Sequence, residues 1–373
     1  MRKPVLLPLI TALIAALLLT ACGPSEPIRI GYVGGLTGRV ADLGIAGRNG
    51  FQLAVEQMNS AGGVQGRQIE VIVKDDAQDP AQAKRVTEEL VAAKVVAIIG
   101  PMTSAMAEPV LAAATAGGIA VVSPTVTTTA LTGKDDLFLR VSSDTSNYAD
   151  LSARHHFNKN GTRRIAAVFD TRNRAYTESW LSDFRKTFLA LGGAVTAELP
   201  FESGAETDHA ALVAKLLSSK PDALLFITNA VDTAHLAQQA RQADPGSKLI
   251  GVEWASTEEL ITLGGQAVEG LHLTQYFDRN DRTQEYLGFR RAYEGRFQRP
   301  PGFAAVAAFD ATRAVLEAIG RAKSSTPVKE ALLERGPFTG AQQAVRFDRF
   351  GDAQRPAFIT KIKDGSFVVE IAD

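Results

Sequence analysis

Hydroxyl side chains follow two short apolar runs in the first third of the sequence. Residues 95–99 are followed by Ser104, and residues 119–122 are followed by Thr125 and Thr127. Each run is typical of a strand that is buried on both faces of a sheet. Ligands of parallel α/β sheets bind beyond the carboxyl ends of the strands, where backbone N–H groups point outward. Ser104 and Thr127 are therefore placed to hold an anion, although Ser and Thr are also common helix N-caps.

A carboxylate occupies a similar place later in the chain. Glu253 directly follows the apolar run 249–252, and its charge can pair with a cationic group of a ligand. A zwitterionic amino acid leaves water only if both of its charges are paired. Hydroxyl groups and Glu253 together would meet that need. The alternative is that Glu253 is a surface cap of a helix that begins near Ser256.

Composition and charge narrow the class of protein. The chain has 373 residues, of which 45% are hydrophobic and 22% charged, so it is globular and long enough for two domains. Its net charge of −1 does not favour nucleic acid as a partner. Neither a G-x-S-x-G nor an H-E-x-x-H motif occurs in it. We therefore expect a binding protein without a cofactor rather than an enzyme; the enzyme alternative is an extracytoplasmic hydrolase.

The sequence gives little support for metal chemistry. Cys22 is the only cysteine, which excludes an intrachain disulfide and a cysteine metal site. His155 and His156 are adjacent, but neighbouring side chains on a helix do not face each other. We therefore expect no metal site.

Apolar runs alternate with helical periods along the chain, which predicts parallel sheets with right-handed crossovers. The pattern begins again after about residue 144, so we expect two similar α/β lobes around a cleft. The alanine-rich stretch before Gly117 either begins as a helix near Glu108 or kinks at Pro109. We expect strands at residues 28–33, 69–73, 95–99, 119–122, 137–141, 165–169, 195–199, 223–227, 249–252, 271–276, 345–347, 357–362 and 366–371.

The N-terminus has the pattern of a lipoprotein signal. A basic start, residues 1–3, precedes the apolar stretch 5–19, and the sequence LTAC ending at Cys22 resembles the bacterial lipobox. We therefore expect residues 1–21 to be a signal peptide and residues 22–27 a tether that is lipidated on Cys22. The mature protein would then lie on the periplasmic or cell-surface side of a membrane. The alternative is an ordinary cleaved signal with a chance cysteine.

Five stretches of the chain resemble the leucine/isoleucine/valine-binding protein family in their order and spacing. They are IRIGYVGGLTGRVADLG, IIGPMTSAMAEP, VVSPTVTTTALT, LIGVEWAS and PPGFAAVAAFDA. Members of this family are solute receptors of branched-chain amino-acid ABC transporters with the type I periplasmic-binding fold. The resemblance covers nearly all of the mature chain and implies two doubly wound lobes joined by a three-crossing hinge near Asp144, Tyr276 and Phe350. It implies these lobe bounds: 28–144 with 277–350 for lobe 1, and 145–276 with 351–373 for lobe 2.

The resemblance also implies roles for individual residues. Ser104 would bind the α-carboxylate of the ligand, Thr125 would offer its backbone carbonyl, and Thr127 its side chain. Tyr176 would close over the ligand, and Glu253 would bind the α-ammonium group.

Other positions depart from the family pattern and concern the side-chain pocket. Asn229 stands where the family has a tyrosine-rich spot, and Leu43 replaces an aromatic residue. Candidates for lining the pocket are Leu43, Trp254, Tyr276 and Phe303. Such a lining favours an apolar or aromatic ligand side chain.

The sequence therefore predicts a monomeric, lipid-anchored receptor that captures an amino acid between two closing lobes and delivers it to an ABC transporter permease. One alternative is a receptor of the same fold for an amide, a urea or an aromatic carboxylate. Another is a ligand-sensing lipoprotein that serves a signalling partner.

Overall fold

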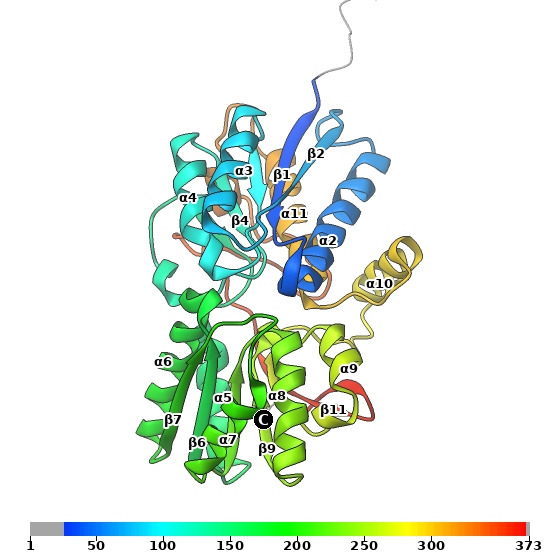
Figure 1. The fold of residues 1–373 in the computed structure, drawn as a ribbon. Coiled ribbons are helices and arrows are strands. Elements are labelled where there is room, and N and C mark those ends of the chain that lie inside the picture. Colours follow the sequence, from blue (N-terminus) through cyan, green and yellow to red (C-terminus); the bar gives the residue numbers. More distant parts are fainter. Residues whose placement is uncertain (1–25, 371–373) are drawn as a thin grey trace, which may run out of the picture.

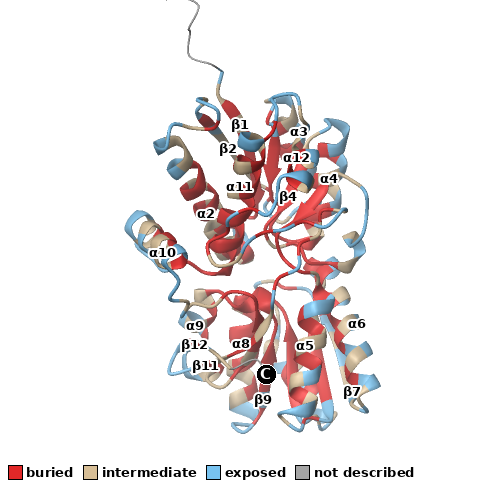
Figure 2. Ribbon diagram, turned by 180° about the vertical axis from the view of Figure 1, so that it is seen from behind, coloured by how far each residue is buried: buried red, intermediate tan, exposed pale blue. Residues whose placement is uncertain are grey.

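The computed structural model describes residues 26–370, which form two α/β lobes, one above the other (Figure 1). The predicted signal peptide and the lipidation site Cys22 lie outside the described residues. Figure 2 shows buried strands inside each lobe and exposed outer faces on the surrounding helices. No helix within residues 26–370 is long and apolar enough to cross a membrane.

The first sheet is wholly parallel and has the strand order β2-β1-β3-β4-β5. Its strands are β1 (Ile28–Gly34), β2 (Ile69–Asp75), β3 (Ala97–Ile99), β4 (Ala120–Ser123) and β5 (Phe138–Arg140). Every residue of β3 and β4 is buried, as expected for strands covered by helices on both faces. The strand order reverses between β1 and β3, and ligand sites of doubly wound sheets lie at such a switch point.

The second sheet has the strand order β12-β11-β10-β9-β8-β6-β7. Its strands are β6 (Arg164–Asp170), β7 (Ala194–Phe201), β8 (Ala223–Ile227), β9 (Lys248–Gly251), β10 (His272–Gln275), β11 (Phe358–Lys363) and β12 (Ser366–Val369). Strands β6 to β10 run parallel, whereas β11 and β12 add an antiparallel edge beside β10. The end of the described chain therefore returns to the second lobe.

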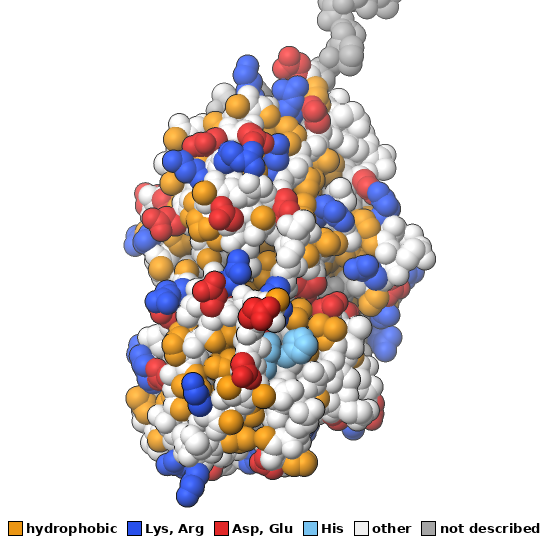
Figure 3. All heavy atoms as spheres, in the orientation of Figure 1, with side chains coloured by type: hydrophobic (Ala, Val, Ile, Leu, Met, Phe, Trp, Pro, Cys, Tyr) orange, Lys and Arg blue, Asp and Glu red, His pale blue; other side chains and the backbone are white. Residues whose placement is uncertain are grey.

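The helices cover the two sheets. They are α2 (Ala41–Ser60), α3 (Pro80–Ala92), α4 (Ala107–Ala116), α5 (Thr145–Asn158), α6 (Arg174–Ala190), α7 (His209–Ser218), α8 (Ala230–Ala243), α9 (Glu258–Gly264), α10 (Gln284–Phe297), α11 (Phe303–Arg321) and α12 (Val328–Glu334). Helix α11 packs along α2, so a late segment of the chain completes the first lobe (Figure 1). Figure 3 shows charges of both signs interspersed over one face of the molecule.

Two local expectations can be compared with the structure. Helix α4 begins at Ala107, so Pro109 lies in its first turn, where a missing N–H group breaks no helical bond. The start near Glu108 is therefore confirmed and the kink is not. The strand expected at residues 345–347 is wrong, because Val345 and Phe347 form only isolated bridges with Phe338 and Ala353.

Arg355 joins the segments that connect the two lobes. Its guanidinium pairs with Asp310 of α11 at 2.8 Å and donates to the carbonyl of Val141 at 2.6 Å. Its backbone N–H donates to Ser143 Oγ at 2.8 Å, and its guanidinium carbon lies 5.4 Å from the ring centre of Tyr276. Arg355 and Asp310 are both buried. The buried Arg355 therefore links the segment around residues 141–143, Tyr276 and α11 to its own segment of the chain.

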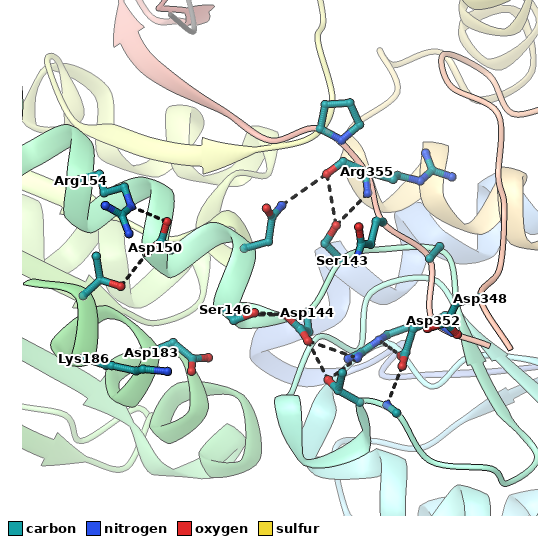
Figure 4. Close-up of a pocket in the computed structure, with 18 of the residues that line it drawn as sticks. Ser143, Asp144, Ser146, Asp150, Arg154, Asp183, Lys186, Asp348, Asp352 and Arg355 are labelled. Carbon is teal, nitrogen blue, oxygen red and sulfur yellow. Dashed lines mark hydrogen bonds and ion pairs between the residues drawn. The ribbon is translucent and has the colours of Figure 1, made fainter. Parts of the chain in front are cut away.

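A groove of about 1250 Å³ opens beside these crossings (Figure 4). In it, Arg140 contacts Asp352 at 2.7 Å and Thr132 Oγ1 at 2.6 Å, and Arg154 contacts Asp150 at 2.8 Å. Arg140 and Arg154 thus have their carboxylate partners within the groove itself. We interpret it as the back of the hinge rather than as the ligand site.

We expect Arg355→Ala to lower the free energy of unfolding by about 3–5 kcal/mol, because Asp310 would stay buried without its cation. Arg154→Ala is the matched control, since it removes only an exposed pair within one helix, which is worth at most about 1 kcal/mol. Urea unfolding followed by circular dichroism measures both changes. Equal losses in the two variants would contradict a central role for the buried pair.

Candidate ligand-binding cleft

A cavity lies between the two lobes, at the carboxyl ends of their strands. The turn η2 (Ser104–Met106) follows β3 of the first sheet, and the turn η5 (Glu253–Ala255) follows β9 of the second. Both turns reach the cavity, which is lined by Leu43, Met102, Thr103, Ser104, Thr125, Thr127, Ser142, Tyr148, Asn173, Tyr176, Glu253, Trp254, Tyr276 and Phe303. The structure therefore brings together all of the predicted ligand-contact residues except Asn229.

The first lobe presents hydroxyl groups to this cavity. Ser104 Oγ accepts a long hydrogen bond from the backbone N–H of Thr127 at 3.4 Å, which joins the loops after β3 and β4. Thr125 Oγ1 donates to the carbonyl of Met102 at 2.6 Å and holds the same two loops together. Thr127 Oγ1 is buried and has no hydrogen-bond partner among the described residues. Thr127 can therefore donate to a guest.

The second lobe presents the carboxylate of Glu253. One oxygen, Oε2, accepts from Trp180 Nε1 at 3.1 Å and from Thr274 Oγ1 at 3.3 Å. The other oxygen, Oε1, is buried and finds no partner within residues 26–370. Burial raises the pKa of Glu253 to about 7. Glu253 is only 6% exposed, so the alternative of a surface cap is wrong.

Two tyrosines also face the cavity with free hydroxyl groups. The hydroxyls of Tyr148 and Tyr176 are buried and make no hydrogen bond of ordinary geometry within the described part of the chain, although Tyr176 lies close enough to the Glu253 carboxylate for the two groups to interact. Burial raises the pKa of both well above the ordinary value for tyrosine, so both remain neutral and can donate. The ring of Tyr176 meets Trp254 edge-on, with 5.5 Å between ring centres.

These free atoms form one set. A buried polar atom without a partner costs about 1–3 kcal/mol. Four of the residues that line this cavity have a buried side-chain atom without a hydrogen-bond partner in residues 26–370; they are Thr127, Tyr148, Tyr176 and Glu253. A guest that carries both an acceptor and a donor would relieve these costs.

Apolar side chains complete the lining. Leu43, Met102, Trp254 and Phe303 are all buried residues of the cavity wall. Tyr276 contributes its ring, because its hydroxyl donates to the carbonyl of Phe303 at 3.2 Å. The cavity therefore combines polar groups with a hydrophobic surface, as small-molecule sites commonly do.

Asn229 lies elsewhere, and the structure does not bring it into the cavity. It caps helix α8, where its side chain accepts from the N–H of Asp232 at 3.0 Å and donates to Asp232 Oδ2 at 2.7 Å. Both ends of the amide are therefore used within the second lobe.

Hydrogen bonds across the cleft hold the lobes together. Arg39 of the first lobe pairs with the buried Asp232 of the second at 2.6 Å. Thr257 Oγ1 donates to Asp42 Oδ2, also at 2.6 Å. Burial alone would raise the pKa of Asp232, but its bond to His209 and the charge of Arg39 help to lower it to about 2. The structure is therefore a closed arrangement of the lobes.

Sequence reasoning missed some lining residues. Met102 and Thr103 lie in the same loop as Ser104, so the strand-end rule could have included them. Ser142, Tyr148 and Asn173 come from the hinge, from α5 and from the turn before α6, and no local motif marks them.

Residues 27–366 match a protein family described as "Periplasmic binding protein". The leucine-, isoleucine-, valine-, threonine- and alanine-binding protein of Pseudomonas aeruginosa is 26% identical over 332 residues, which cover 88% of this chain and 87% of that protein. The Leu/Ile/Val-binding protein BraC3 of Rhizobium johnstonii is 28% identical over 354 residues, covering 94% and 95%.

Solved structures agree with these matches. The branched-chain amino-acid transporter substrate-binding protein LivJ of Streptococcus pneumoniae, in complex with isoleucine, aligns with a TM-score of 0.86 and 25% identity over 93% of this chain and 99% of that chain. A solute-binding protein of R. palustris in complex with benzoate aligns with a TM-score of 0.83 and 20% identity over 92% and 95%. Neighbours of this kind confirm the type I periplasmic-binding fold.

Proposed function

The chain belongs to the periplasmic binding protein family, and we propose that it binds a single zwitterionic amino acid in the cleft between its lobes. The observation that carries the proposal is the set of free polar atoms in one cavity, with a carboxylate oxygen on one lobe and a hydroxyl on the other. Relatives named as binding proteins for leucine, isoleucine and valine support this ligand class.

In the proposed complex each charge of the ligand has a partner. The α-carboxylate accepts from Thr127 Oγ1 and from a tyrosine hydroxyl, beside Ser104. The α-ammonium donates to Glu253 Oε1, which is held in place by Trp180. Charge-assisted bonds of this kind are about twice as strong as bonds between neutral groups.

The ligand side chain would contact the hydrophobic part of the cavity. Leu43, Trp254 and Phe303 supply that surface, which favours an apolar or aromatic side chain. The two charge anchors belong to opposite lobes, so only the closed form satisfies both. A bound ligand therefore shifts the equilibrium between open and closed forms toward closure.

An aromatic carboxylate is the second candidate ligand. The edge-on pair of Tyr176 and Trp254 offers a surface for an aromatic ring, and a structural neighbour is in complex with benzoate. Because the pKa of Glu253 is about 7, a protonated Glu253 could donate a hydrogen bond to such an anion. A thermal-shift screen of amino acids against benzoate, with a urea and an amide included, separates these classes, because a ligand that binds the folded state stabilises it.

We further propose that the protein is a lipid-anchored monomer that delivers its ligand to an ABC transporter permease. The ligand would be released chemically unchanged, so mass spectrometry after incubation distinguishes this role from the hydrolase alternative. A permease gene beside the coding region would favour transport over signalling.

We expect Cys22→Ser to release the protein from the membrane fraction or to leave it unprocessed, because the lipobox cysteine would no longer carry lipid. Membrane fractionation and the mass of the N-terminal peptide test this. A wild-type protein without lipid on that peptide would contradict the anchor.

We expect Glu253→Ala to weaken amino-acid binding by about two to three orders of magnitude, because removing one partner of a buried charge pair costs about 3–5 kcal/mol. Calorimetry against the best wild-type ligand measures the change. Glu198→Ala is the matched control, since Glu198 pairs with Arg185 on the surface of the same lobe. An unchanged affinity of Glu253→Ala would reject the ammonium anchor, and the aromatic carboxylate would then be favoured.

We also expect affinity for the amino acid to fall as pH is lowered below about 7, by up to about tenfold per unit, because Glu253 must lose its proton before it can pair with ammonium. For the free protein we expect the opposite trend: burial raises the pKa of Glu253 above its value in the unfolded chain, so stability should fall as pH rises through about 7, where the buried carboxylate ionises without a cation. Calorimetry across this range, with Glu253→Gln as control, tests the assignment. A pH dependence that persists in Glu253→Gln would show that another group titrates.

A further inference from the structure

Metal-binding side chains converge at the far end of the second lobe. Among the residues that the structure describes, His155, His272 and Glu370 form a group whose ligand atoms all lie within 4.8 Å of one another. His155 lies in the last turn of α5, and His272 is the first residue of β10. The cleft lies beyond the carboxyl ends of the strands, so this group at the amino end of β10 is separate from it.

We propose that His155, His272 and Glu370 bind a divalent transition-metal ion such as Zn²⁺. His155 Nε2 lies 3.5 Å from Glu370 Oε2, and His272 Nε2 lies 3.4 Å from Glu370 Oε1. Ligands of a tetrahedral zinc ion with bonds of about 2.0–2.1 Å are separated by about 3.3 Å. The two distances involve different oxygens of the Glu370 carboxylate, and one ligand atom from each of the three residues lies within 4.8 Å of the other two. A small adjustment of the side chains would bring the three ligand atoms to a common ion, and both N···O distances are longer than that of an ordinary N–H···O bond.

The bonding state of His155 supports this assignment independently. Its Nε2 atom is buried and has no hydrogen-bond partner in the described part of the chain. A neutral imidazole can offer the lone pair of such a nitrogen to a metal ion. Two neutral imidazoles and one carboxylate are a known ligand set for zinc, with the fourth position left to water.

The surroundings set the strength and access of the site. Lys361 lies opposite His272 in the β10–β11 strand pair, and Lys159 is near His155. The positive charges of these two lysines repel a metal ion and so weaken its binding. The Glu370 side chain is 35% exposed, which leaves a route for an ion from solvent. A bound ion would join α5, β10 and the residue that directly follows β12.

The expectation of no metal site rested on the single cysteine and on the adjacent pair His155 and His156. The ring of His156 is fully buried, and its Nδ1 bonds to Asn160 at 3.0 Å, so it does not share a ligand position with His155. The partners of His155 come instead from β10 and from the end of the described chain. Folding, rather than sequence proximity, brings them together.

Calorimetric titration of Zn²⁺ into protein without a histidine tag, after treatment with a chelator, tests the site. We expect one ion per chain, and we expect His155→Ala, His272→Ala and Glu370→Gln each to weaken binding at least about tenfold through loss of one ligand. His235→Ala is the matched control, because His235 is an exposed histidine on α8 of the same lobe. Co²⁺ in place of Zn²⁺ should give the visible absorption of a low-symmetry nitrogen and oxygen site.

Absence of Zn²⁺ binding by the wild type would overturn the proposal, as would equal binding by the three variants and the control. Circular dichroism in chelator shows whether each variant is folded, and Glu370→Gln keeps the shape of the side chain if an alanine variant fails. The site does not depend on the proposed ligand. Amino-acid binding in the cleft should therefore be retained when the metal ligands are removed.

Discussion

The buried pair between Arg355 and Asp310 is the interaction on which the two-lobe arrangement depends. It joins the last crossing segment to α11 of the first lobe, while the same arginine bonds to the carbonyl of Val141 in the first crossing. A buried pair is rarely a strong source of net stability, but its directional bonds select one geometry. Cleft residues carried by different lobes can meet in register only if the hinge is specified this closely.

The cleft has the opposite character, because its polar groups are left incomplete. The hinge arginine has partners for its guanidinium, whereas Thr127, Tyr148 and Glu253 keep unpartnered atoms within the described chain. Each such atom raises the free energy of the closed, empty form. The direct lobe–lobe bond between Arg39 and Asp232 works against this cost. In the function proposed above, a guest of the right polarity would remove this cost and so favour the closed form.

Periodicity was sufficient to predict most strands, because buried parallel strands are continuous apolar runs. It failed at residues 345–347, where an apolar run forms only isolated bridges. The strand-end rule, together with the family resemblance, placed Ser104 and Glu253 at the cavity, since each lies in the connection that follows the carboxyl end of a strand. Tyr148 could not be predicted, because its approach depends on how the hinge orients α5. Asn229 illustrates the converse: a residue at a strand end can be occupied entirely by capping the next helix.

The proton on Glu253 distinguishes the two candidate ligand classes more sharply than the shape of the cavity does. An ionised Glu253 accepts from an ammonium group, and a protonated Glu253 donates to a carboxylate. With a pKa of about 7, both forms are populated near neutral pH. A cationic group beside Glu253 lowers its pKa and an anionic group raises it. An amino acid should therefore release a proton on binding, whereas an aromatic carboxylate held against Glu253 should take one up. In either proposed complex the hydrophobic wall formed by Trp254 and Phe303 would contact the apolar part of the ligand, so selection between the two classes would fall to the carboxyl group of Glu253.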